Sequence, residues 1–146
     1  MKILLTAINA KYIHSNLAVY SLKAYAQSRV TDSDTEIALA EYTINQQTDD
    51  ILMDIYRRKP DVLCFSCYIW NISYVETVLR EVYKVLPDTK IWLGGPEVSY
   101  DAVAVLKRLP EVTGVMKGEG EETFAELAEG IELVGLQGIT WRREDG

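Results

Sequence analysis

Few residues in this sequence could cross-link the chain or anchor it in a membrane. The only two cysteines, Cys64 and Cys67, are too few for a disulfide framework. No apolar run is long enough to span a bilayer, and the apolar start over residues 1–6 is too short for a signal peptide. We therefore expect a cytoplasmic protein with no membrane partner.

Basic residues are also in the minority. Lysine and arginine together number 15 against 22 aspartates and glutamates, so the formal net charge is −7. A protein that binds duplex nucleic acid or an anionic membrane surface needs a basic face to neutralise phosphates, so the charge disfavours both partners. What the chain does have is 48% apolar residues over 146 positions, which is enough for one folded domain with a core.

Strand-like apolar runs alternate with helix-like segments along the chain. Each connection between strands is long enough for a right-handed crossover helix, so the strands should be parallel. The pattern predicts an α/β domain built on a doubly wound, five-stranded parallel sheet, flavodoxin-like or Rossmann-like in architecture. The expected strands cover residues 2–7, 35–42, 61–66, 91–93 and 112–116, and helices follow each of them.

The C-terminal tail breaks this alternation. Residues 139–143 are strand-like, and residues 144–146 form a turn with nothing after it. We therefore assign residues 1–134 to the domain and residues 135–146 to a linker, and we expect the sequence to be part of a longer protein.

Several common sites of such sheets are missing. No Gly-Lys-Ser/Thr sequence ends a phosphate-binding loop, and the first strand-to-helix turn, residues 8–15, has no glycine for a dinucleotide fingerprint. A phosphoacceptor receiver domain needs an aspartate at the end of the third strand, where this chain has Ser66. Cys64 and Cys67 lie on and just after a buried strand that points them to opposite faces, so we expect core packing rather than metal or redox chemistry.

The end of the fourth strand is the most informative stretch. Residues 91–93 run into Gly94 and Gly95, Pro96 prevents the strand from continuing, and Ser99 can cap the next helix. Paired glycines let the backbone turn tightly or let a ligand come close. Open α/β sheets bind ligands at the carboxyl ends of their strands, so we expect the ligand at this edge.

These loops resemble the cobalamin-binding domain at the N-terminus of a large group of radical S-adenosylmethionine (SAM) enzymes. The most specific similarities are Leu-Gly-Gly-Pro-Glu at residues 93–97 and Gly-Glu-Gly-Glu-Glu-Thr-Phe at residues 118–124, while His-Ser-Asn-Leu-Ala at residues 14–18 looks like uncharacterised members. The resemblance implies cobalamin as the cofactor. It also implies a C-terminal radical SAM domain in the parent chain, with an iron–sulfur cluster and S-adenosylmethionine, although this sequence has no Cys-x-x-x-Cys-x-x-Cys motif.

The resemblance also assigns the cofactor contacts. Glycines and hydroxyls would make room for the nucleotide tail of cobalamin, and glutamates would accept hydrogen bonds from the amides of the corrin ring. The alternative is that the glycines only terminate strands and the glutamates only begin helices. The expected cofactor-binding residues are Tyr12, His14, Ser15, Asn16, Ser66, Tyr68, Gly94, Gly95, Pro96, Glu97, Ser99, Gly118, Glu119, Gly120 and Glu121.

The first loop departs from classical cobalamin domains, in which Asp-x-His-x-x-Gly supplies a histidine to cobalt. Aligning His14 with that histidine places Tyr12 at the aspartate position and Leu17 at the glycine position. The partner that would polarise the imidazole is then missing. We therefore expect no metal ligand from this chain, with His14 on cobalt as the alternative.

Two functions are left open by the sequence. The first is a cobalamin-binding module, not itself catalytic, of a radical SAM enzyme that transfers methyl groups or closes a ring oxidatively. The second is a flavodoxin-like interaction domain that has lost its cofactor site. Retention of added cobalamin would separate the two.

Overall fold

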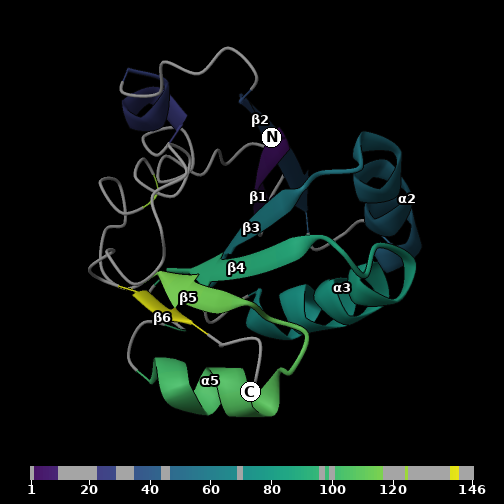
Figure 1. Ribbon diagram of the computed structural model, residues 1–146. Coiled ribbons are helices and arrows are strands. Elements are labelled where there is room, and N and C mark those ends of the chain that lie inside the picture. The colour runs from purple at the N-terminus through teal and green to yellow at the C-terminus, as the bar shows by residue number, and fades with distance from the viewer. Residues whose placement is uncertain are drawn as a thin grey trace.

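The apolar runs assemble into one sheet in the computed structural model of the chain (Figure 1). The strand order is β2-β1-β3-β4-β5-β6, and the first five strands are parallel, which confirms the predicted doubly wound sheet. The strands are β1 (Lys2–Asn9), β2 (Glu36–Thr43), β3 (Val62–Ser66), β4 (Lys90–Gly94), β5 (Gly114–Met116) and β6 (Ile139–Trp141).

The structure describes residues 2–9, 23–28, 35–43, 47–68, 71–95, 98, 101–116, 124 and 139–141.

The sixth strand was expected only as a strand-like piece of a linker. In the structure β6 pairs antiparallel with β5, and Ile139 lies opposite Met116. The sheet therefore continues past residue 134, where the sequence placed the domain boundary. The sequence alone could not assign this strand to the sheet, because its partner β5 lies more than twenty residues earlier in the chain.

Helices cover both faces of the sheet (Figure 1). On one face lie α2 (Thr48–Arg58), α3 (Ile72–Val85) and α5 (Ala102–Arg108), whose buried residues share one apolar cluster with the sheet. On the other face the helical residues 23–28 contribute Ala26, and Phe124 joins a second cluster there. A sheet covered on both faces explains why every residue of β3 is buried, rather than every second one.

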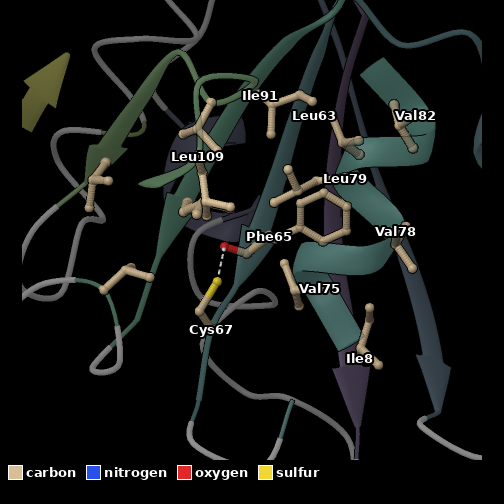
Figure 2. Close-up of a cluster of buried hydrophobic side chains, with 14 of the residues drawn as sticks. Ile8, Leu63, Phe65, Cys67, Val75, Val78, Leu79, Val82, Ile91 and Leu109 are labelled. Atoms are coloured by element: carbon tan, nitrogen blue, oxygen red, sulfur yellow. Dashed lines mark hydrogen bonds between the residues drawn. The ribbon is translucent and has the colours of Figure 1, made fainter. Parts of the chain in front are cut away.

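Helix α3 shows how the pattern of apolar residues positions the elements. Its buried residues Val75, Val78, Leu79 and Val82 recur every three or four positions, and they face Phe65 of β3 in the same cluster (Figure 2). Burying each aliphatic side chain contributes about 1.5–3 kcal/mol. This packing places the N-terminus of α3 at the carboxyl edge of the sheet.

Two helix boundaries depend on residues that the sequence analysis did not single out. Helix α2 ends at Lys59, a non-glycine residue with φ of +46° before Pro60, so the turn precedes the proline expected to stop the helix. Helix α5 is capped by Asp101, whose carboxylate accepts from the Ala104 N–H at 3.2 Å. Ser99, which the sequence offered as a cap for the helix after β4, lies outside the described residues.

None of the helices in the described ranges is both long enough and apolar enough to cross a membrane.

Candidate cofactor site

Three small residues lie side by side where the central parallel strands end. In the strand register Ala7 of β1 is the partner of Ser66 of β3, and Ser66 is the partner of Gly94 of β4. We call Ala7, Ser66 and Gly94 the small-residue row. Adjacent strands lie about 4.8 Å apart, so the row extends across roughly 10 Å of the sheet edge.

The row faces away from α2 and α3. The residues two positions earlier on the three strands, Leu5, Cys64 and Trp92, belong to the opposite apolar cluster together with Ala7. Strand alternation puts Ser66 and Gly94 on that same face. The strand order reverses between β1 and β3, and a doubly wound sheet binds its ligand at this reversal. The row therefore lies where the topology favours a ligand.

The two glycines at the end of β4 serve different purposes. A Cβ at Gly95, where φ is +100°, would lie 2.4 Å from the carbonyl oxygen and 2.9 Å from the nitrogen of Cys67. At Gly94 a Cβ would meet only the Met116 carbonyl oxygen among the described residues, at 3.8 Å. Gly95 is thus required by the neighbouring backbone, whereas the expected room for a ligand lies beside Gly94.

The loop after β3 is tied directly to the end of β4. The Cys67 N–H donates to the Gly94 carbonyl oxygen at 2.7 Å, which extends the strand pairing by one step. The structure therefore brings together four of the predicted contacts: Ser66, which is buried, the half-buried Tyr68, and Gly94 with Gly95.

A buried asparagine that the sequence analysis did not single out joins the ends of β1 and β3. Asn71 has no exposed surface, and its Nδ2 donates to the carbonyl oxygens of Ile8 and Ser66, each at 3.0 Å. Its Oδ1 accepts from the Tyr68 N–H at 2.8 Å. An asparagine directly before a helix predicts an N-cap, but this side chain makes no cap hydrogen bond to α3. Its role depends on contacts distant in sequence.

The remaining predicted contacts lie outside the described residues and stay predictions. They are Tyr12, His14, Ser15, Asn16, Pro96, Glu97, Ser99, Gly118, Glu119, Gly120 and Glu121.

The two cysteines pack in the core, as expected, on opposite faces of the sheet. Cys64 belongs to the cluster under the small-residue row, and Cys67 belongs to the cluster under α3, where its Sγ lies 3.9 Å from the Phe65 carbonyl oxygen (Figure 2). Burial raises the pKa of the Cys64 thiol to about 12, so the thiolate is not available at neutral pH. Within the described ranges no group of three acidic, histidine or cysteine side chains is placed to hold a metal ion.

The sequence matches the B12 binding domain family over residues 3–128, a range that contains the five parallel strands apart from Lys2, the first residue of β1. The chain belongs to the B12-binding domain family. This membership confirms the predicted cofactor, cobalamin, and favours a cobalamin-binding domain over an interaction domain that has lost its site.

Two methyltransferases are relatives of this B12-binding domain. The 2-(S-pantetheinyl)-carbapenam-3-carboxylate methyltransferase of Streptantibioticus cattleyicolor is 40% identical over 68 residues, which is 47% of this chain and 10% of that protein. The cobalamin-dependent radical SAM methyltransferase TokK of Streptomyces tokunonensis is 36% identical over 69 residues, again 47% of this chain and 10% of that protein. The chain thus spans about a tenth of the length of these relatives.

A solved structure shares the fold. The cobalamin-dependent S-adenosylmethionine radical enzyme OxsB, solved with aqua-cobalamin and S-adenosylmethionine bound, superposes with a TM-score of 0.77 at 17% identity. The match covers 99% of this chain and 21% of the OxsB chain. At this level of identity the similarity shows the fold of the B12-binding domain.

Proposed function

We propose that this B12-binding domain is the cobalamin-holding module of a longer radical SAM enzyme whose reaction is methyl transfer. The observation that carries the proposal is the small-residue row, which lies at the strand reversal of a domain that belongs to the B12-binding family. The two methyltransferase relatives favour methyl transfer, and the similarity to an anaerobic magnesium-protoporphyrin IX monomethyl ester cyclase, 24% identical over 77% of this chain, keeps oxidative ring closure as the alternative. In the parent chain a C-terminal radical SAM domain would supply the iron–sulfur cluster and S-adenosylmethionine.

The described residues fit cobalamin at this edge of the sheet. The bulky nucleotide tail needs an edge without large side chains. Gly94 is partly exposed at this edge, and its strand neighbours Ser66 and Ala7 are buried small residues that keep the edge free of bulk. Gly94 leaves space that a Cβ would occupy, because its nearest described neighbour would be 3.8 Å away. In this proposal the Ser66 hydroxyl would bond a polar atom of the tail.

The domain itself binds and orients the cofactor. When bound, cobalamin supplies a cobalt atom that can carry a methyl group. The chain contributes a fixed platform: Gly95 lets the end of β4 pack against Cys67, and the Cys67 N–H joins the loop after β3 to Gly94. Cys64 and Cys67 are buried and do not take part in the chemistry. The proposal places the protein in the cytoplasm, where free thiols such as these stay reduced.

The predicted contacts outside the described residues complete the proposed site. Glu97 and Glu119 would accept hydrogen bonds from the corrin amides. The glycines at 118 and 120 would let their loop approach the ring. His14 would lie beneath the corrin without binding cobalt.

The test is retention of hydroxocobalamin by the chain. The protein is mixed with an excess of hydroxocobalamin and desalted, and its visible spectrum is compared with the protein concentration. We expect one cobalamin per chain to be retained at micromolar protein. A colourless protein that remains folded by circular dichroism would contradict the proposal.

A further inference from the structure

Asn71 connects several backbone segments of the site although it is buried and cannot touch a cofactor. Its side chain has no exposed surface, yet both amide hydrogens and the amide oxygen are used in hydrogen bonds. The two accepting carbonyls, of Ile8 and Ser66, belong to neighbouring strands on the two sides of the strand reversal. One side chain thus connects segments that are 63 residues apart in sequence.

Each group that Asn71 holds leads into a proposed cofactor contact. Ser66 is the central member of the small-residue row, and Tyr68 follows it in the β3–α3 loop. Ile8 lies at the end of β1, from which the chain enters the loop that contains Tyr12 and His14. An apolar side chain of the same size would fill the space but would remove three buried hydrogen bonds, those to the Ile8 and Ser66 carbonyls and that from the Tyr68 N–H. The arrangement of donors and acceptors therefore matters beyond packing.

We propose that Asn71 is a positioning residue of the cobalamin site, which fixes the ends of β1 and β3 and the first residues after β3 in the geometry that holds the cofactor. This inference rests on the proposed function. In this role Asn71 increases the affinity of the site for cobalamin without touching the cofactor.

The experiment compares Asn71→Asp, which loses two donated hydrogen bonds, with a control that loses one buried hydrogen bond far from the site. Aspartate keeps the size of asparagine and an acceptor for the Tyr68 N–H, but an ionised carboxylate cannot donate to the two carbonyls. The control is Thr89→Val, because the buried Thr89 hydroxyl donates to the Pro60 carbonyl oxygen at 2.8 Å at the opposite edge of the sheet. Asn71→Ser is a second variant in case the aspartate variant does not fold.

Melting temperature and the dissociation constant for hydroxocobalamin are measured for each folded variant, with binding titrated well below its melting temperature. We expect Thr89→Val to lower the melting temperature but to change the dissociation constant by less than about twofold. The folded Asn71 variant should raise the dissociation constant at least about tenfold.

The outcomes separate this inference from the proposed function. If the unaltered chain retains cobalamin and a folded Asn71 variant binds it equally well, the positioning role is wrong while the proposed function stands. Equal weakening by the Asn71 variant and by Thr89→Val would likewise overturn the inference, because any loss of stability would then suffice. Failure of the unaltered chain to bind would overturn the proposed function and the inference with it.

Discussion

The two glycines after β4 should respond differently to the same substitution. Gly95→Ala places a Cβ 2.4 Å from the Cys67 carbonyl oxygen at a residue with φ of +100°. We expect a loss of about 2 kcal/mol or more in the free energy of unfolding. Gly94→Ala meets no such contact among the described residues, so it should leave stability nearly unchanged and weaken cobalamin binding instead.

Urea unfolding curves and hydroxocobalamin titrations of both variants check this prediction. A stable Gly95→Ala protein would show that the loop after β3 does not press against this glycine. Unchanged cobalamin affinity in Gly94→Ala would show that the nucleotide tail does not pass over the small-residue row.

Single residues of the site were predictable only where a local motif marks them. Gly94 and Gly95 follow a strand directly, and Ser66 ends one, so their position at the binding edge follows from sequence. The division of roles between the two glycines did not, because it depends on the Cys67 backbone, which packs there from another loop. Asn71 was missed for the same reason, since its partner Ile8 is distant in sequence.

At the level of elements, a polar cluster joins β2 to α2. The Tyr42 hydroxyl donates to Asp54, and Arg58 Nε donates to the same carboxylate oxygen at 3.0 Å. Burial by itself would raise the pKa of Asp54, but the hydrogen bonds from Tyr42 and Arg58 outweigh it and lower the pKa below the usual 3.8. Burial, followed by the hydrogen bond to Asp54, raises the pKa of Tyr42 well above 10.

This cluster predicts a particular loss of stability in acid. Because the folded-state pKa of Asp54 is the lower one, its ionised form stabilises the fold above 3.8, and that contribution is lost as the pH falls from this value through the lower pKa of the folded state. Between about pH 5 and pH 3 the melting temperature of the unaltered protein should therefore fall more steeply than that of Asp54→Asn. Tyr42→Phe, which removes one of the two hydrogen bonds, should give an intermediate slope. Parallel pH profiles for all three proteins would contradict the assignment.

Most elements could be predicted because their signals are local. The helical spacing in α2 and α3 and the apolar run of β3 depend only on neighbouring residues. The error at the start of β5 comes from a local backbone turn that the apolar pattern does not mark. Strand β5 begins at Gly114 rather than Val112, because the Val112 N–H turns back to the Leu109 carbonyl oxygen instead of joining the sheet.

In the whole molecule the two edges of the sheet have different roles: the amino edge contributes only to stability, and the carboxyl edge contributes to cofactor binding as well. The amino edge is tied by contacts such as the Lys2 N–H to Asp61 carboxylate bond at 2.8 Å and the Thr89 hydroxyl bond to Pro60. The carboxyl edge carries the small-residue row, the close approach at Gly95 and the Asn71 connections. Variants at the amino edge should therefore affect folding alone, whereas those at the carboxyl edge should affect the cofactor.

The central claim is that cobalamin binds at this carboxyl edge with its nucleotide tail drawn away from cobalt and onto the small-residue row. Electron paramagnetic resonance of the bound cofactor in its cob(II)alamin state tests this claim most directly, because a nitrogen ligand on cobalt splits the signal. Tyr12 and Leu17 stand where a classical domain has its aspartate and glycine, so His14 lacks the partner that would prepare it as a ligand. We predict a spectrum without nitrogen superhyperfine splitting.

The variant His14→Ala identifies the source of any splitting that is observed. Splitting that disappears in His14→Ala would assign cobalt ligation to this histidine and overturn the prediction of a ligand-free lower face. Splitting that persists in His14→Ala would mean that the nucleotide base stays on cobalt. That result would contradict the claim that the tail lies over Ala7, Ser66 and Gly94, whereas an unsplit signal in both proteins is the result that the account predicts.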